Sequence, residues 1–157
     1  MMKIREMTFD DIAAVAEIER DNSLTPWDET GLFTYLIRDD TLFLVAESEA
    51  PQQEILGYAG LLMVPYEADI TNITVKESAR RRGIGESLLK ELFSLSGQHG
   101  VSVIHLEVRA SAEAAKQLYQ KLGFKKDGIR KNYYTGPAED AVTMTLTLAE
   151  PAAGILQ

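Results

Sequence analysis

The sequence predicts a single-domain α/β (α+β) fold in which helices cover a mixed sheet. Segments with the helical spacing of apolar residues are interleaved with segments of strand length and strand periodicity. The expected order is two helices, three strands, a helix, a strand, a helix and two strands. The 157 residues suffice for one hydrophobic core, and no repeat or Gly-, Pro- or Ser-rich linker divides them. We therefore expect one domain over residues 1–148 and a C-terminal tail over residues 149–157.

The first two elements are expected to be helices. Thr8 and the acidic residues after it are typical of a helix start, and the apolar spacing predicts a helix from about Phe9 to about Arg20. A second start signal follows at Thr25 and Pro26, because a capping hydroxyl precedes a proline at the first helical position. The apolar stripe of this second helix would be Leu32, Phe33, Leu36 and Ile37.

Three strands are expected next. Residues 42–47 and 55–64 are apolar runs of strand length separated by polar residues, which predicts an antiparallel hairpin with an exposed loop. Residues 69–75 alternate in polarity and are rich in β-branched side chains, which favours a third strand. A helix then opens at Gly83 and ends at Gly97 and Gly100.

Strands and one helix complete the expected order. Residues 103–109 alternate between two faces, with Glu107 on the more polar one. Ser111 is a candidate cap for the last helix, which Gly123 would end. The final elements are an extended segment over 124–134 and, after a turn at Gly136 and Pro137, a half-buried strand over 140–148.

Composition excludes several classes of function. The 24 acidic and 16 basic residues give a net charge of −8, which disfavours a nucleic-acid binder and favours a cationic partner. The absence of cysteine excludes disulfides, iron–sulfur clusters and thiol nucleophiles, and the two histidines make a metal site unexpected. Apolar runs are shorter than the roughly 20 residues of a membrane span. With no signal peptide visible, we expect a cytoplasmic protein that does not contact membranes.

A basic glycine turn between a strand and a helix is the strongest local feature. Such a turn can hold a phosphate, because glycines and a helix start leave backbone N–H groups open to an anion. It lacks the pattern of a Walker loop or of a dinucleotide-binding fingerprint, and a solvated basic turn is an equally simple interpretation. The residues concerned are Ile73, Thr74, Val75, Arg80, Arg81, Arg82, Gly83, Ile84, Gly85 and Glu86.

This turn carries a resemblance to a known family. Arg80-x-x-Gly83-x-Gly85 after a β-branched strand looks like the acetyl-CoA pyrophosphate motif of the GNAT acyltransferase superfamily. Further stretches are similar to the ribosomal-protein-alanine N-acetyltransferases, the RimI-like enzymes, so that the similarity covers roughly residues 4–148. They are residues 106–111, 118–124, 130–134 and 139–141.

The resemblance implies a fold and a chemistry. The fold would be GNAT-like, a mixed, mostly antiparallel central sheet of about six to seven strands flanked by about four helices. The family's catalytic base corresponds to Glu107, and its general acid, which protonates the departing thiolate, to Tyr119. By spacing alone Glu107 could be a solvated or ion-paired carboxylate, although glutamate is depleted in strands. Tyr119 could equally be a core residue, although a phenol pKa of about 10 suits proton donation to a thiolate.

The resemblance also implies how acetyl-CoA, the expected cosubstrate, would be held. The strand Ile73, Thr74 and Val75 would pair with the pantetheine arm through its backbone, and the Val75 N–H would be the natural oxyanion donor. Ala112 departs from the family pattern, since close relatives have asparagine there. The contact that the asparagine makes with the cofactor is therefore missing.

For the acceptor, relatives hold a peptide N-terminus near an aromatic pair that matches Tyr133 and Tyr134, and Trp27 matches the tryptophan of their Pro-Trp. Each of these aromatics could instead be a packing residue, and the only tryptophan is more often buried.

Four functions are weighed. The expected one is transfer of acetyl from acetyl-CoA to the N-terminal α-amine of a protein, a basic ribosomal protein with N-terminal alanine, by direct attack in a ternary complex. The alternatives are a small-molecule amine as acceptor, an idle acyl-CoA-binding module, and an RNA binder using Arg80, Arg81 and Arg82. The net charge and the lack of an aromatic platform speak against RNA. We expect a monomer or a weak dimer.

Overall fold

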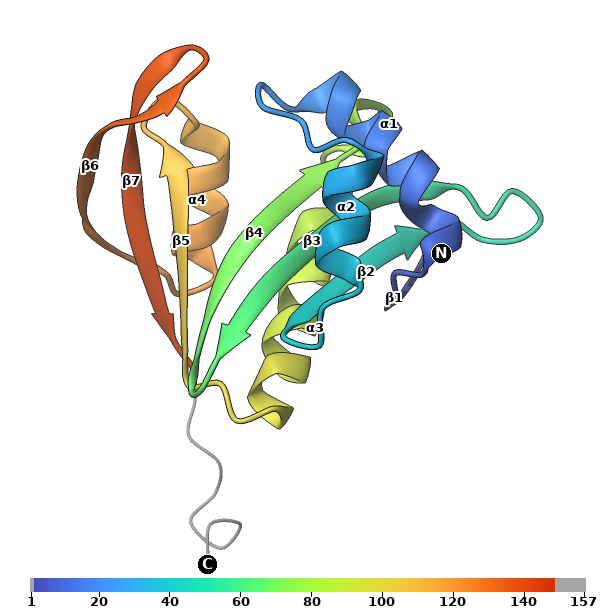
Figure 1. Ribbon diagram of the computed structural model, residues 1–157, viewed down its shortest axis with the longest axis horizontal. Coiled ribbons are helices and arrows are strands. Elements are labelled where there is room, and N and C mark those ends of the chain that lie inside the picture. The colour runs from blue at the N-terminus through green and yellow to red at the C-terminus, as the bar shows by residue number, and fades with distance from the viewer. Residues whose placement is uncertain (1, 149–157) are drawn as a thin grey trace, which may run out of the picture.

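A computed structural model describes residues 2–148, which form one seven-stranded sheet with helices on both faces (Figure 1). The sheet order is β1-β2-β3-β4-β5-β7-β6, and every neighbouring pair is antiparallel except β4 and β5. The strands are β1 (Lys3–Glu6), β2 (Thr41–Glu47), β3 (Ile55–Val64), β4 (Glu67–Val75), β5 (Val103–Arg109), β6 (Lys125–Thr135) and β7 (Ala138–Thr147). The expected mixed, mostly antiparallel sheet is therefore confirmed.

Two helical layers bury the two faces of this sheet. The short 3-10 helix η1 (Phe9–Asp11), α1 (Ile12–Asn22) and α2 (Glu29–Leu36) lie on one face, and α3 (Ile84–Gln98) and α4 (Glu113–Lys121) on the other. A second 3-10 helix, η2 (Glu77–Ala79), precedes α3. Within residues 2–148, no helix is long and apolar enough to cross a membrane.

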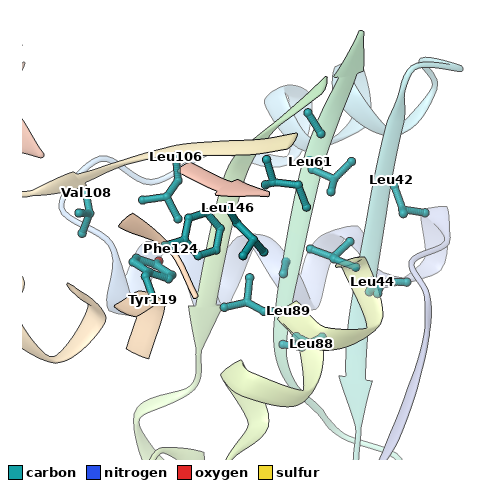
Figure 2. Close-up of a cluster of buried hydrophobic side chains, with 14 of the residues drawn as sticks. Leu42, Leu44, Leu61, Leu88, Leu89, Leu106, Val108, Tyr119, Phe124 and Leu146 are labelled. Atoms are coloured by element: carbon teal, nitrogen blue, oxygen red, sulfur yellow. The ribbon is translucent and has the colours of Figure 1, made fainter. Parts of the chain in front are cut away.

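Alternation along the strands creates two separate cores. On β2, Phe43 and Val45 pack with α1 and α2, whereas Leu42 and Leu44 face α3. The larger core continues from α3 to α4 and β5, where apolar strand residues meet the aromatic pair of Tyr119 and Phe124 (Figure 2).

Two sequence predictions about helix starts are wrong. The second helix begins at Glu29 with Asp28 as its N-cap, and the Asp28 carboxylate accepts from the Gly31 N–H at 2.8 Å, so Thr25 and Pro26 do not start it. The N-cap position of the last helix is occupied by Ala112 and not by Ser111. The Ser111 N–H instead donates to a Glu139 oxygen at 2.6 Å.

The expected apolar stripe of the second helix is also only half correct. Leu32 is buried, but the side chains of Phe33 and Ile37 are 47% and 57% exposed. This eight-residue helix buries the face that carries Leu32, Tyr35 and Leu36, and Phe33 packs on the surface against Phe9. A helix of two turns therefore cannot bury all the apolar residues that its spacing suggests.

Strand β1 is missing from the sequence prediction, because three of its four residues are charged and they show no clear apolar alternation. The predicted first helix starts as the 3-10 turn η1 and extends to Asn22. Strands β2 to β7 lie within two residues of their expected ends. The expected tail, residues 149–157, lies outside the described residues.

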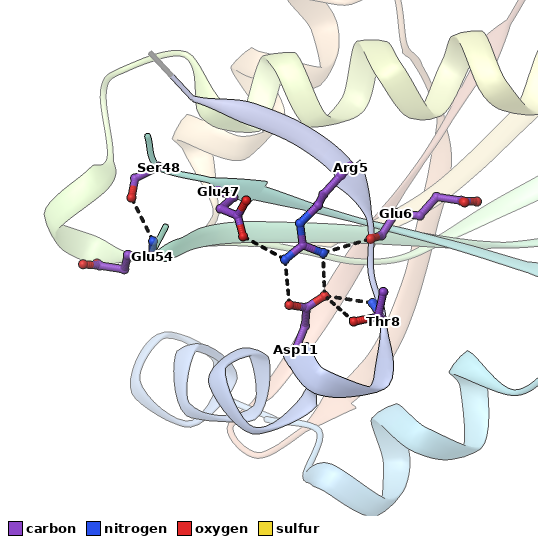
Figure 3. A network of polar contacts seen from close by, with 7 residues as sticks. All are labelled: Arg5, Glu6, Thr8, Asp11, Glu47, Ser48 and Glu54. Atoms are coloured by element: carbon purple, nitrogen blue, oxygen red, sulfur yellow. Dashed lines mark hydrogen bonds and ion pairs between the residues drawn. The ribbon is translucent and has the colours of Figure 1, made fainter. Parts of the chain in front are cut away.

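A charged cluster ties β1 to the start of the first helical layer (Figure 3). The Arg5 guanidinium donates to both oxygens of Asp11 at 2.8 Å and to Glu47 at 3.0 Å. Burial would raise the pKa of Asp11, but hydrogen bonds from Arg5 and from the Thr8 N–H outweigh it and hold the pKa below its ordinary value. The cluster fixes the N-terminal segment on the edge of the sheet.

The lowered pKa of Asp11 makes the stability of the protein depend on pH. Its contribution is present above the unfolded pKa of about 4 and is lost as the pH falls through the lower folded pKa. We expect Asp11→Asn to lower the free energy of unfolding by about 1–3 kcal/mol at pH 7, and the difference from wild type to shrink at pH 3. Urea unfolding at pH 7 and pH 3 measures the free energy of unfolding of both proteins. A difference between wild type and variant that is the same at the two pH values would contradict this account.

Candidate active site

A cleft opens where β4 and β5 separate. These parallel strands pair only through Glu67–Asp69 of β4 and Val103–His105 of β5, and then diverge (Figure 1). The opening has a volume of about 720 Å³ and is lined by both strands, by the segment between α1 and α2, and by α4. Of the residues predicted for the site, eight line it: Trp27, Ile73, Thr74, Val75, Arg80, Glu107, Tyr119 and Tyr134.

The end of β4 presents unpaired backbone to this cleft. The Lys76 N–H donates to the Leu56 carbonyl at 2.8 Å and so points toward β3. Because successive N–H groups of a strand point to opposite edges, the Val75 N–H points to the other edge, into the cleft. The Val75 carbonyl on that edge accepts from Arg80 Nε at 3.2 Å. A ligand in extended conformation can therefore pair with this edge of β4.

The glycine turn leads from this edge into α3. Gly83 is the N-cap of α3 and has a φ of +76°, a left-handed conformation that glycine adopts without strain. A side chain at Gly83 would meet no protein atom within 4 Å, so the space above the turn is open. The first N–H groups of α3 have no intrahelical acceptor and face this space with the positive end of the helix dipole. The turn thus fits the phosphates of a cofactor.

Six residues of the predicted phosphate motif do not line the cleft wall: Gly83, Ile84 and Gly85, which form the turn and the start of α3, and Arg81, Arg82 and Glu86. Arg81 is exposed, and Arg82 donates to the Ser78 carbonyl at 3.2 Å. Glu86 accepts from Lys121 at 2.7 Å and from Lys90 at 2.9 Å, and these bonds lower its pKa to about 2. The side chain of Glu86 therefore joins α3 to α4, and only its backbone is free for a ligand.

Glu107 is half-buried in the middle of β5 and faces the cleft. The alternation expected for this strand is confirmed, since Ile104, Leu106 and Val108 are buried and Glu107 lies on the opposite face. The Tyr133 hydroxyl donates to Glu107 Oε1 at 3.3 Å. Burial, followed by the charge of Glu107, raises the pKa of Tyr133. This carboxylate is thus reachable from the cleft and has one hydroxyl partner.

Tyr119 reaches the same cleft from α4. Its ring is 6% exposed and packs edge-on against Phe124, with centroids 5.8 Å apart. Burial raises the pKa of Tyr119 to about 12, with a smaller contribution from Tyr134. The phenol is therefore protonated at neutral pH, but it is a weaker acid than the unperturbed phenol that the sequence predicts. Tyr119 is both a core residue and a cleft residue.

The aromatics predicted for the acceptor surround the cleft entrance. Trp27 is half-buried and stacks on Tyr35, with centroids 4.5 Å apart. Tyr134 lines the cleft, and the Arg109 guanidinium lies 4.2 Å above its ring. Tyr133 is 46% exposed and reaches the cleft only through its bond to Glu107.

Ala112 is the N-cap of α4 and makes no side-chain capping bond. An asparagine at this position would cap the helix, since its side chain accepts from N–H groups of the first turn. Alanine in place of the family's asparagine therefore leaves the start of α4 without a side-chain cap, at the wall of the cleft.

Sequence reasoning missed three charged residues of the cleft wall, Glu19, Arg109 and Glu113. Arg109 donates to the Pro137 carbonyl at 3.0 Å and to Glu139 at 3.3 Å, which ties β5 to the turn between β6 and β7. Glu19 is 2% exposed. A signal for Glu19 exists in the sequence, because it follows Val15 by one helical turn and so lies on the apolar stripe of the first helix.

Comparison with known proteins agrees with this geometry. The pattern of the Acetyltransferase (GNAT) family matches residues 9–124, which include β4, the glycine turn, Glu107 and Tyr119. The chain belongs to the GNAT acetyltransferase family.

Relatives of this GNAT protein are similar over nearly the whole chain. A Bacillus subtilis protein, provisionally named [ribosomal protein bS18]-alanine N-acetyltransferase, is 36% identical over 148 residues, which cover 94% of this chain and 96% of that protein. The crystal structure of the ribosomal-protein-S18-alanine N-acetyltransferase from Escherichia coli is 32% identical with a TM-score of 0.86, and the match covers 98% and 97% of the two chains.

A second similar structure, of a Salmonella typhimurium protein provisionally named an acetyltransferase, was solved with its cofactor acetyl-CoA. It is 23% identical with a TM-score of 0.80, and the match covers 97% and 96% of the two chains. The GNAT fold that the resemblance implies is confirmed, as is its consequence that this protein is an acetyl-CoA-dependent N-acetyltransferase.

The open space at the glycine turn makes a testable prediction. We expect Gly83→Val to abolish detectable acetyl-CoA binding, because a branched side chain is strained at a φ of +76° and fills the space in front of the α3 N-terminus. Calorimetric titration with acetyl-CoA measures it. Gly136→Val is the matched control, since Gly136 is also open but lies in the turn between β6 and β7. Unchanged affinity in a folded Gly83→Val protein would contradict the phosphate assignment.

Proposed function

We propose that this protein acetylates the N-terminal α-amine of a basic ribosomal protein that begins with alanine. The observation that carries the proposal is that one cleft holds a carboxylate, Glu107, a protonated phenol, Tyr119, and the free backbone edge of β4. These are the three groups that amine attack on a thioester needs: a base, an acid and an oxyanion donor. The names of the relatives support the acceptor class.

In the proposed reaction the amine attacks the thioester carbonyl directly. Glu107 takes the proton from the ammonium, directly or through a water, and Tyr133 holds the carboxylate in place. The chain has no cysteine, so a thiol acyl-enzyme is excluded, which agrees with direct transfer in a ternary complex. The Val75 N–H, on the free edge of β4, stabilises the carbonyl oxygen as it gains negative charge.

Tyr119 completes the proposed reaction by protonating the departing thiolate. Its pKa of about 12 keeps the proton on the phenol until the sulfur carries negative charge. The phenol therefore still holds its proton when acetyl-CoA and the acceptor are bound. Ile73, Thr74 and Val75 would pair with the pantetheine arm of acetyl-CoA, which supplies the activated acetyl group. Arg80, with the backbone of Gly83, Ile84 and Gly85, would hold the pyrophosphate.

The acceptor is proposed to enter on the side of Trp27, Tyr133 and Tyr134. A second groove of about 430 Å³ begins at Glu107 and is lined by Asp69, Asp127, His105 and Arg130 among others. The groove has three carboxylates, including Glu107, and one arginine. This excess of negative charge favours a peptide with basic residues following its N-terminal amine. This groove supports a basic peptide over a small neutral amine.

Acceptor identity is tested with two basic peptides of one sequence, one with a free N-terminal alanine and one N-blocked with its lysines intact. We expect thiol release from acetyl-CoA with the free peptide alone, since only its α-amine would reach Glu107. Equal turnover of both would point to lysine side chains. Turnover of small amines alone would replace the proposed acceptor, and acetyl-CoA binding without any turnover would refute the proposal.

The role of Glu107 is tested by Glu107→Gln, which keeps the size of the side chain and removes its basicity. We expect kcat to fall on the order of 100-fold at neutral pH, the usual contribution of a positioned base. Acetyl-CoA affinity should stay within about twofold, because Glu107 faces the acceptor groove. Steady-state kinetics and calorimetry measure the two effects. Full activity of the variant would remove Glu107 from the proposed mechanism.

A further inference from the structure

A buried carboxylate, Glu19, lies in the wall of the cleft and forms no ion pair within residues 2–148. It is on α1 and is 2% exposed. Asp11, the other buried carboxylate among residues 2–148, is paired with Arg5, whereas no ion pair within the same residues involves Glu19. Burial of a carboxylate without a counter-ion is costly unless hydrogen bonds compensate for the lost water.

Hydrogen bonds from three parts of the chain satisfy this carboxylate instead. Oε1 accepts from the Tyr58 hydroxyl of β3, from the Thr74 hydroxyl at 3.1 Å and from Asn72 Nδ2 at 3.4 Å. Oε2 accepts from the Trp27 N–H at 3.3 Å. Burial and then the charge of Glu19 raise the pKa of Tyr58, which keeps that hydroxyl a donor. All four partners are donors, so both oxygens of the Glu19 side chain act as acceptors.

The partners of Glu19 belong to separate parts of the chain around the cleft. Thr74 and Asn72 are on the part of β4 that has no pairing with β5 and whose free edge is proposed to hold acetyl-CoA. Trp27 belongs to the segment between α1 and α2, on the proposed acceptor side. Tyr58 pairs with Thr74 across the β3–β4 ladder, which places both hydroxyls at the same oxygen. One carboxylate thus connects the strand of one substrate to the segment of the other.

We propose that Glu19 is a positioning residue for acetyl transfer, which fixes the Trp27 segment relative to the free edge of β4. The segment has no regular structure between Ser23 and Asp28, so its placement depends on such contacts. The opposite edge of β4 is already held by β3 from Gly57 to Val64. The acceptor side therefore depends more on Glu19 than the acetyl-CoA side does. This role rests on the proposed function.

Glu19→Gln tests the role, because an amide replaces one acceptor oxygen by an NH₂ group that faces donors. We expect kcat/KM for the acceptor peptide to fall roughly tenfold, the loss that follows when a buried donor is left unpaired. The dissociation constant of acetyl-CoA should change by less than about threefold. Trp27, the only tryptophan, should emit at longer wavelength and be quenched more strongly by acrylamide.

Two further variants separate positioning from general loss of stability. Tyr58→Phe removes one donor to Glu19 from a residue that does not line the cleft, and should shift the acceptor kinetics and the Trp27 emission in the same direction by a smaller amount. Asp11→Asn changes the other buried carboxylate, remote from the cleft, and should lower stability while kinetics and emission stay as in wild type.

Three results would overturn the role of Glu19. They are wild-type kinetics and emission in a folded Glu19→Gln protein, equal losses of acceptor and acetyl-CoA binding, and an Asp11→Asn variant that loses as much activity as Glu19→Gln. Failure of the proposed function is a separate result, namely a wild-type protein that turns over no acceptor. In that case Trp27 emission and acetyl-CoA binding of the same variants still decide whether Glu19 fixes the segment.

Discussion

The short parallel pairing of β4 and β5 is the constraint on which the rest of the structure depends. Three residues of each strand pair and the strands then separate, which leaves the end of β4 with backbone groups that no strand satisfies. In most sheets a free edge of this kind must be covered or blocked. Here it forms the wall of a cleft of about 720 Å³, and an extended ligand can occupy the place of the missing strand.

Opening a sheet in this way requires that both walls be held by other contacts. On the β5 side, Arg109 bonds the turn between β6 and β7 and lies over the Tyr134 ring. On the β4 side, the Glu19 carboxylate accepts hydrogen bonds from β3, β4 and the Trp27 segment. Each wall thus has one charged residue whose hydrogen bonds join separate parts of the chain. Apolar packing alone would not fix these irregular segments in one position.

Burial assigns different chemistry to the two candidate catalytic side chains. Tyr119 lies in the core between α4 and β5, where desolvation keeps its proton on the phenol. Glu107, two residues from the pairing of β4 with β5, is on the opposite, more open face of β5 and contacts a hydroxyl. One cleft therefore combines a desolvated phenol and a more open carboxylate.

The sequence by itself determined the order of the elements after β1, the strand ends to within two residues and the glycine turn. These are local properties, since periodicity and glycine conformation act within a few residues. Glu107 and Tyr119 became candidate catalytic residues through the resemblance to the GNAT family. Two predictions failed. The second helix begins after Asp28 and not at Thr25 and Pro26, because two start signals compete there. Strand β1 was missed because its charged residues show no apolar alternation. Only the tertiary structure decided that β4 and β5 diverge, that Tyr119 is desolvated, and that Glu19 meets Thr74 and Trp27. Those facts depend on contacts between residues far apart in the chain, which no local pattern encodes.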